Sequence, residues 1–308
     1  MGRYSARRLL QTIPVFFGAT FLVFAMVFAI PGDPIRAMAG DRPLSEATVE
    51  TMRDRYNLDD PLLIQYGKYI GGVFTGDLGE SFRGREVSDI LVQRVPVTAK
   101  LAATALVIEA ILGLIAGILA GLRRGSFIDN LVLVTTTAVV SIPVFVLGYV
   151  AQLVVGVELG WLPIAGIRDG WPMSYIMPGF VLAATSTAYA ARLLRTSLVE
   201  NLRADYVRTA TSKGLKRSRV VGRHTLRNSL IPVVTFVGAD FGVMMGGAII
   251  TEGIFNMPGI GREVFRAILA QEGTVVVGIV TVLIMIFIIS NLIVDLLYGV
   301  LDPRIRYE

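Results

Sequence analysis

The chain has 308 residues, of which 54% are hydrophobic and only 17% are charged, and its mean hydropathy is +0.65. Soluble proteins carry roughly 25% charged residues, so this composition excludes an ordinary soluble domain and predicts a membrane protein. The formal net charge is +5 and cysteine is absent, which excludes disulfides, thiolate chemistry and cysteine-based zinc sites.

The first predicted membrane span covers Leu9–Ile30, which contains no charged residue and follows Arg3, Arg7 and Arg8. A signal peptide also has basic residues before an apolar run. The run here is longer than that of a signal peptide, and no small-residue cleavage site precedes Pro31–Pro34. We therefore expect a retained helix with a cytoplasmic N-terminus.

Residues 31–96 are polar and contain two amphipathic helix patterns. Ser45 and Asp60 precede these patterns as predicted N-caps, and Pro61 follows Asp60 as the expected first helical residue. We expect a small helical subdomain outside the membrane, in which Gly76–Phe82 (GDLGESF) forms a turn.

The second and third spans follow this subdomain. Leu101–Leu122 has Glu109 as its only charge, and the pair Arg123-Arg124 after it indicates a cytoplasmic loop by the positive-inside rule. Asn130–Val157 is uncharged and contains Pro143, where a kink in the helix is expected.

Three more spans complete a predicted six-helix topology with both termini in the cytoplasm. Ser174–Ala191 is short and rich in Ala, Ser and Thr, which favours close helix packing. Leu230–Thr251 contains Asp240 as its only charge, and Val275–Val294 has none. Glu109 is expected to pack against other helices, and Asp295 to pair with arginines of the loop before the fifth span.

The most basic stretch lies between the fourth and fifth spans, from Arg195 to Arg227. It carries nine Lys or Arg residues against two acidic residues. Positive-inside topology accounts for this excess without a nucleic-acid partner, and contact with lipid head groups alone is one interpretation. Asp205 is a predicted helix cap, and Gly214 is the expected residue that ends a short helix between them.

The chain lacks the motifs of a phosphate-binding loop and of an HExxH metal site. The only Gly-Lys pair, Gly67-Lys68, lacks the first glycine and the Ser or Thr of a phosphate-binding loop. His224 is the only histidine and lies in the basic loop, which excludes an HExxH site and makes a Ser–His dyad within the membrane unexpected. We predict no catalytic residue, no bound cofactor and no metal site.

The segments Asp205–Ala210, Lys213–Leu215 and Arg223–Pro232 together resemble the EAA loop of binding-protein-dependent ABC importer permeases. They are most similar to the B-type permeases of dipeptide and oligopeptide importers. Arg208-Thr209-Ala210 stands where Glu-Ala-Ala would be, a departure typical of that subgroup. Further motifs carry the resemblance along nearly the whole chain: Pro31–Pro34, Gly76–Phe82, Ser141–Gly148, Leu162–Gly166, Thr251–Arg262 and Leu301–Arg306.

The resemblance implies an all-α type I ABC importer permease in the cytoplasmic membrane. It implies a second, C-type permease, two ABC ATPase subunits that bind ATP and Mg²⁺, an extracytoplasmic solute-binding protein, and a peptide substrate. The expected domains are an N-terminal tail and first span (1–30), the extracytoplasmic helical subdomain (31–96), a transmembrane core (97–299) with its coupling loop (195–229), and a cytoplasmic tail (300–308).

Two sets of functional residues are expected. Those that couple to the ATPase are Asp205, Tyr206, Val207, Thr209, Ala210, Lys213, Gly214 and Leu215. Those on the translocation path are Asp240, Pro258, Gly259 and Gly261. An acid within a span is a functional-site hypothesis by default: Asp240 either meets the amino group of a peptide or bonds to a neighbouring helix. A rigid turn by itself also explains the proline and glycines.

Other functions stay open at this stage. An ion-coupled secondary transporter often shows repeated halves, which this sequence lacks, and a membrane anchor without transport is a third class. Relatives of the same permease type import nickel complexes or glutathione, so the resemblance does not decide the substrate.

Overall fold

The computed structural model describes residues 2–29, 45–55, 57–82 and 84–301 of the chain. These residues form helices and connecting turns, without a β-strand among them, which confirms the all-α class. The motif Pro31–Pro34 and residues 302–306 of the last motif lie outside the described ranges. The helices are α1 (Gly2–Phe28), α3 (Glu46–Arg55), α4 (Leu62–Thr75), α5 (Val87–Leu122), α6 (Phe127–Ser141), α7 (Val144–Ala151), η1 (Gln152–Glu158), α8 (Met173–Asn201), α9 (Asp205–Ser212), α10 (Arg217–Arg219), η2 (Val220–Thr225), α11 (Leu226–Ile254), α12 (Ile260–Leu269) and α13 (Gly273–Leu301), where η denotes a π-helix.

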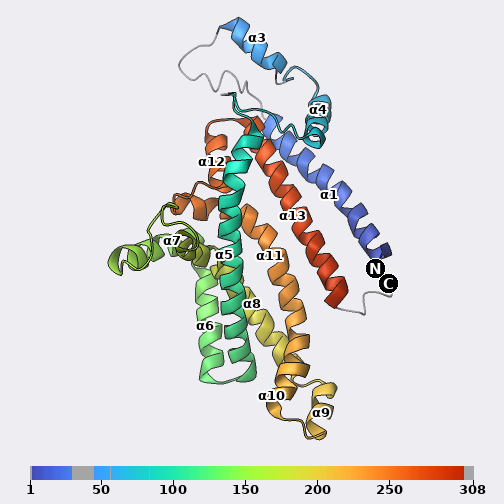
Figure 1. Ribbon diagram of the computed structural model, residues 1–308, viewed down its shortest axis with the longest axis vertical. Coiled ribbons are helices and arrows are strands. Elements are labelled where there is room, and N and C mark those ends of the chain that lie inside the picture. The colour runs from blue at the N-terminus through green and yellow to red at the C-terminus, as the bar shows by residue number, and fades with distance from the viewer. Residues whose placement is uncertain (1, 30–44, 56, 83, 302–308) are drawn as a thin grey trace.

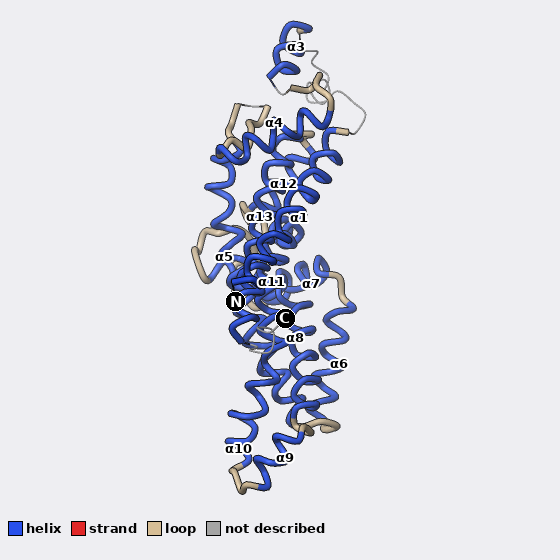
Figure 2. Tube along the Cα trace, turned by 90° about the vertical axis from the view of Figure 1, so that its right-hand side faces the viewer, coloured by secondary structure: helices blue, strands red, loops and turns tan. Residues whose placement is uncertain are grey.

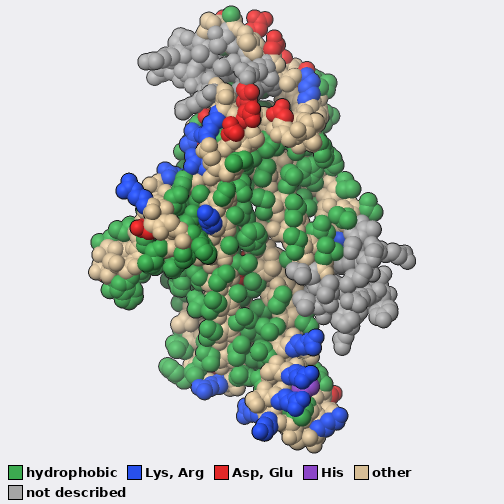
Figure 3. Space-filling view, viewed as in Figure 1, with side chains coloured by type: hydrophobic (Ala, Val, Ile, Leu, Met, Phe, Trp, Pro, Cys, Tyr) green, Lys and Arg blue, Asp and Glu red, His purple; other side chains and the backbone are tan. Residues whose placement is uncertain are grey.

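The long helices form one elongated bundle. Figure 1 shows α5, α6, α8 and α11 running along its length, with α13 beside α11 and α1 against the outer side of α13. The short helices α3 and α4 lie at one end, and α9 and α10 form the opposite tip, as Figures 1 and 2 both show. Hydrophobic side chains cover most of the middle of the molecule, and charged side chains gather at its two ends (Figure 3).

Four helical segments are long and apolar enough to cross a membrane: Arg7–Phe28, Val87–Leu122, Arg217–Ile254 and Gly273–Leu296. They contain the first, second, fifth and sixth predicted spans. The predicted fourth span lies within α8, whose Ala, Ser and Thr content and two arginines, Arg192 and Arg195, lower its hydropathy.

The predicted third span is broken rather than kinked. The segments Phe127–Ser141 and Val144–Glu158 are bent by 102° relative to each other. Ile142 has an extended backbone (φ −92°, ψ 125°) ahead of Pro143, because a residue before proline is sterically pushed out of the helical region. The expected kink is therefore a full interruption, and η1 continues from α7 in the new direction.

The expected boundary at residue 96 falls inside a helix. α5 begins at Val87 and contains Pro96 within its first third. The predicted cap of α4 is also wrong, since Pro61 occupies the N-cap position, and the Asp60 carboxylate instead pairs with Lys68 at 2.6 Å. The first residues of a helix have backbone N–H groups with no partner inside the helix. Proline has no N–H, so it loses no hydrogen bond at that position.

The apolar stripe of α4 attaches this helix to the bundle through two tyrosines. The Tyr66 hydroxyl donates to the Phe17 carbonyl of α1 at 3.0 Å and lies 2.9 Å from the Thr20 hydroxyl. The Tyr69 hydroxyl donates to Thr281 of α13 at 2.7 Å, and burial raises the pKa of Tyr69 to about 12. The predicted amphipathic helix thus packs on the first and last spans.

A stripe of glycines on α5 allows a close approach to α8, the helix with which α5 has its most extensive contact. Gly113, Gly117 and Gly121 recur every fourth residue and face Ala190, Leu194 and Leu198 of α8. A Cβ atom at Gly117 would lie 2.7 Å from the Cβ of Leu194 and 2.8 Å from the Ala191 carbonyl. Small residues at this spacing let two backbones approach within a membrane.

Replacing Gly117 with alanine should separate α5 from α8. The added methyl meets a backbone carbonyl that cannot rotate away, and overpacking of this kind costs about 1–3 kcal/mol. We expect a lower thermal unfolding midpoint for the purified protein in nanodiscs. Gly246→Ala is the matched control, because a Cβ at that position of α11 meets no atom within 4 Å. Equal midpoints for both variants would contradict the proposed packing role of Gly117.

Candidate functional site

The basic loop folds into a compact helical hairpin between α8 and α11. Val207 and Ala210 of α9 pack against Val220 of η2, and Leu215 of the connecting turn covers them. These four side chains form a small apolar core, while the polar residues of α9 face outward. We call the segment from Asn201 to Thr225 the coupling hairpin; it projects from one end of the bundle (Figure 2).

The eight predicted coupling residues all lie in this hairpin but take two different positions. Asp205, Tyr206, Thr209, Lys213 and Gly214 are exposed. Val207, Ala210 and Leu215 instead point into the apolar core of the hairpin. The exposed residues are therefore available to a partner, whereas the apolar ones hold α9 in place.

The two ends of α9 agree only in part with the prediction. Asp205 is not a cap: Ala204 occupies the N-cap position, and Asp205 is the first helical residue, 3.6 Å from Arg208. An acid in the first turn still interacts favourably with the helix dipole. Gly214 has φ +75° and follows the last residues of α9, which confirms it as the left-handed residue that ends the helix.

Polar contacts at the base of the hairpin join α9 to the end of α8, and α8 to α11. The Tyr206 hydroxyl donates to the Asn201 side chain at 2.6 Å. The Ser229 hydroxyl of α11 lies 3.4 Å from the Ser197 carbonyl of α8. A displacement of the hairpin would therefore act on α8 and α11 together.

Arg195 is not part of the exposed basic surface. Its Nε and Nη2 bind the two carboxylate oxygens of Asp129 at 2.5 and 2.8 Å, and the Gly125 N–H donates to the same carboxylate at 2.8 Å. Asp129 is 1% exposed. This bidentate ion pair connects the start of α6 to the last third of α8, and the remaining Lys and Arg side chains cover the tip of the hairpin (Figure 3).

Asp240 lies on α11 and is 8% exposed. Where α11 packs against α5, its neighbour is Glu109, which is fully buried. The two carboxyl groups are close enough to interact, but both Glu109 oxygens and Oδ2 of Asp240 have no hydrogen-bond partner among the described residues. Glu109 also lines a cavity of about 300 Å³ together with Leu230 and Val294. Two facing acids in an apolar surrounding require a proton or a cation to offset their charge.

Asp295 forms a structural ion pair, but not with the predicted loop arginines. Its carboxylate lies 3.3 Å from Arg8 of α1. α13 packs on α1, so this cation comes from the first helix and not from the hairpin. The contact brings the start of α1 next to the end of α13.

The turn that contains Pro258, Gly259 and Gly261 is built around a buried acid. Glu252 at the end of α11 is 0% exposed; its Oε1 accepts from the Thr98 hydroxyl at 2.5 Å and its Oε2 accepts from the Arg262 N–H at 3.0 Å. The Ile260 N–H donates to Thr98 at 2.8 Å. Glu252 and Thr98 thus satisfy backbone N–H groups at the start of α12, where a negative charge is favourable.

Close contacts with α11 explain why both glycines are needed. A side chain on Gly259 would overlap the Glu252 carboxylate, and a Cβ on Gly261 would lie 2.6 Å from the Ile249 Cα. Sequence reasoning did not identify Glu252, which directly follows the predicted fifth span as the first residue of the next loop. A carboxylate at the end of a span, seven residues before a glycine-rich turn, was the available signal.

Thr98→Val should loosen this turn. The substitution keeps the side-chain volume but leaves the Glu252 carboxylate without one donor and the Ile260 N–H without its acceptor. Each unsatisfied buried group costs about 1–3 kcal/mol, so we expect a clear drop in the thermal unfolding midpoint. Thr137→Val serves as the control, because that exposed hydroxyl bonds only to a carbonyl of its own helix. An unchanged midpoint in Thr98→Val would refute the role of this contact.

Chemically, the described residues offer surfaces for partners rather than a reaction centre. Within the described ranges there is no group of three or more His, Cys, Asp or Glu side chains that could hold a metal ion. Apolar helices, a charged hairpin at one end and a structured turn at the other define a polytopic membrane protein.

Comparison with known proteins identifies the family. The family described as binding-protein-dependent transport system inner membrane component matches residues 113–307, and the corresponding N-terminal membrane-component family matches residues 1–102. The chain belongs to this family and is a permease subunit of an ABC importer in the inner membrane.

Individual relatives are similar over their whole length. The chain is 38% identical to the di/tripeptide transport system permease protein DppB of Pseudomonas aeruginosa (strain UCBPP-PA14), over 99% of both chains. It is 40% identical to the glutathione transport system permease protein GsiC of Escherichia coli (strain K12), over 100% of both.

A solved structure is similar in fold. A chain of the inward-facing MetNI methionine ABC transporter matches with a TM-score of 0.58 at 17% identity, covering 69% of this chain and 96% of that chain. At this identity the similarity concerns the fold alone, which is that of an ABC importer permease.

Proposed function

We propose that this permease moves dipeptides or short oligopeptides into the cytoplasm and that its coupling hairpin binds an ATPase subunit. The observation that carries the proposal is the hairpin itself. An apolar core holds its helix α9 rigid, and a separate set of exposed residues faces outward. Topology alone would require only positive charge, not a packed helix that ends at a glycine.

The proposed assembly contains a second, C-type permease, two ABC ATPases that bind ATP and Mg²⁺, and an extracytoplasmic solute-binding protein. When nucleotide closes the ATPases, a docked short helix is carried as a rigid body. Its movement would displace α8 and α11, because α8 directly precedes the hairpin in the chain and α11 directly follows it.

The proposed topology has six spans: α1, α5, the broken α6–α7 pair with η1, α8, α11 and α13. The contact between Arg8 and Asp295 supports placing both chain ends on one side of the membrane, because it joins the start of α1 to the end of α13. The exposed Trp161 and Trp171 between η1 and α8 suit the opposite interface. The subdomain with α3 and α4 is then extracytoplasmic.

The proposed translocation path includes Asp240 and the turn with Pro258, Gly259 and Gly261. Among the described residues, Oδ2 of Asp240 has no hydrogen-bond partner, and the side chain faces Glu109. Such a pair is a suitable contact for the amino group of a peptide. Pro258 and Gly259 line a pocket at the extracytoplasmic end of α5.

ATP-dependent uptake by proteoliposomes that contain all the partners tests the function as a whole. We expect uptake of a labelled dipeptide only when ATP is supplied on the ATPase side. Glutathione is the second candidate substrate, favoured by the 40% identity to a glutathione permease, and competition between the two substrates ranks them. Uptake driven by an ion gradient without ATPase subunits would instead support a secondary transporter.

Gly214→Val should uncouple ATP hydrolysis from uptake. A β-branched residue at φ +75° costs about 1–3 kcal/mol of local strain, which would displace the end of α9. We expect several-fold more ATP hydrolysed per peptide, with normal membrane insertion. Gly222→Val is the control within the same hairpin, because a Cβ at that position meets no atom within 4 Å. Wild-type coupling in Gly214→Val would count against docking at α9.

Asp240→Asn should reduce peptide uptake while ATPase assembly stays intact. The amide cannot attract an ammonium group as a carboxylate does, so the half-saturating peptide concentration should rise several-fold. Kinetics indistinguishable from wild type would assign Asp240 to helix packing and remove it from the path.

A further inference from the structure

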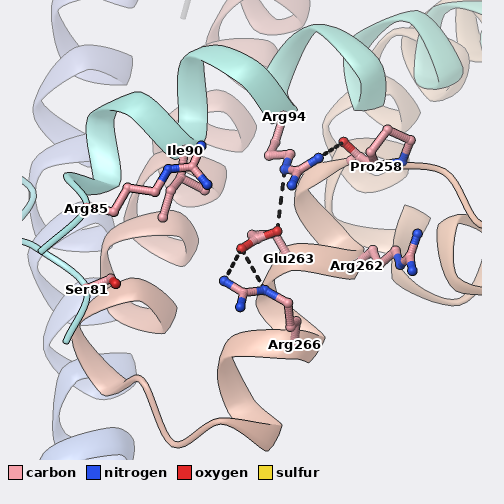
Figure 4. A pocket seen from close by; sticks show the side chains of 9 residues that line it. Ser81, Arg85, Ile90, Arg94, Pro258, Arg262, Glu263 and Arg266 are labelled. Atoms are coloured by element: carbon pink, nitrogen blue, oxygen red, sulfur yellow. Dashed lines mark hydrogen bonds and ion pairs between the residues drawn. The ribbon is translucent and has the colours of Figure 1, made fainter. Parts of the chain in front are cut away.

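A pocket of about 440 Å³ lies at the end of the bundle opposite the coupling hairpin, between the start of α5 and α12. Figure 4 shows arginines around it: Arg85 and Arg94 on the side of α5, and Arg262 and Arg266 from α12. Pockets that hold small molecules have volumes of about 300–1,000 Å³, so this cavity can accept a molecule the size of a short peptide.

One acid in the pocket, Glu263, is already shared by two of these arginines. Its Oε1 accepts from Nε and Nη2 of Arg266 at 2.9 and 2.5 Å, and its Oε2 lies 3.4 Å from Nε of Arg94. Arg94 also donates to the Pro258 carbonyl at 3.3 Å. Hydrogen bonding to Glu263 holds the pKa of Arg266 above its usual range. The positive charge of Arg266 is therefore offset by the negative charge of Glu263.

Neither of the other two arginines forms an ion pair with an acidic side chain among the described residues. Arg85 donates at 2.7 Å to the neutral side chain of Gln93. The exposed guanidinium of Arg262 forms no hydrogen bond or ion pair with any residue in the part of the chain that the structure describes; its backbone N–H binds Glu252. Four guanidinium groups therefore line the cavity, and Glu263 is the only carboxylate among the lining residues. Glu252 and Glu272 interact electrostatically with Arg94 and Arg266, so Arg85 and Arg262 are the lining cations that lack an acidic partner among the described residues.

We propose that this pocket binds the C-terminal carboxylate of the peptide, with Arg262 as its principal contact and Arg85 as a second cation. The inference rests on the proposed function as a peptide permease. Guanidinium groups pair with carboxylates through two parallel hydrogen bonds.

The shape of the site favours a small ligand over an acidic side chain of the solute-binding protein. A side chain inserted from another protein would occupy only the mouth of the cavity. The cavity extends further inward, where the buried side chain of Ile90 forms part of its wall. The volume beyond the arginines leaves room for the rest of a peptide. A protein partner is the alternative that the experiment has to separate.

The test measures equilibrium binding of a radiolabelled dipeptide to the complete importer complex in nanodiscs, without the solute-binding protein. The same dipeptide with a C-terminal amide is the second probe. We expect the wild-type complex to prefer the free carboxylate by roughly tenfold, since a hydrogen-bonded ion pair is lost in the amide. Arg262→Gln should abolish this preference and Arg262→Lys should retain part of it. Arg168→Gln, an exposed arginine outside the pocket, should leave it unchanged.

A second arm measures the affinity of the solute-binding protein for the same complexes, which should be equal in wild type and Arg262→Gln. Weaker protein docking with an unchanged carboxylate preference would overturn the inference. So would a wild-type complex that takes up the dipeptide but shows no carboxylate preference in binding. A wild-type complex that takes up no peptide at all would instead refute the proposed function.

Discussion

The direct contact between α5 and α8 is the constraint on which the rest of the core depends. Helices in a membrane gain little from burying apolar surface against each other, because lipid is equally apolar, and close van der Waals contact is needed instead. Gly113, Gly117 and Gly121 provide it by leaving the surface of α5 without side chains. α8 then continues without interruption to Asn201, where the coupling hairpin begins. The ion pair of Arg195 with Asp129 adds α6 to the same unit. A force applied to the hairpin is thus delivered to packed helices rather than to a loose loop.

The buried acids of this chain differ in how their charge is satisfied, and that difference separates structure from function. Glu252 accepts hydrogen bonds from a threonine and from backbone N–H groups, so it holds a turn together. Asp129 has a bidentate arginine partner. Glu109 and Asp240 face each other without such partners among the described residues. Of these four acids, the last two are the ones whose charge is not satisfied by a described donor or cation.

Periodic and compositional features were predictable from sequence, because they depend on local chemistry. The apolar stretches identified the long helices, and the glycine after Lys213 identified the end of α9. Contacts between distant segments were not predictable: Asp295 pairs with Arg8 rather than with the loop arginines, and Arg195 leaves the basic surface to bind Asp129. The break before Pro143 was expected as a kink, since sequence does not reveal how far a helix turns at a proline. Burial of Val207 and Ala210 also required the fold, because η2 supplies the residue against which they pack.

The proposed binding of the coupling hairpin to an ATPase subunit can be measured directly, because the chain contains no cysteine. A single cysteine at Thr209 or Lys213, both exposed on the hairpin, can be labelled with a photoactivatable cross-linker in the assembled complex. A cysteine at the exposed Arg168 on the proposed extracytoplasmic side is the control. We predict cross-links from positions 209 and 213 to an ATPase subunit, with a yield that changes when nucleotide is added, and none from position 168. A transport-competent complex in which neither hairpin position reaches an ATPase would contradict the account.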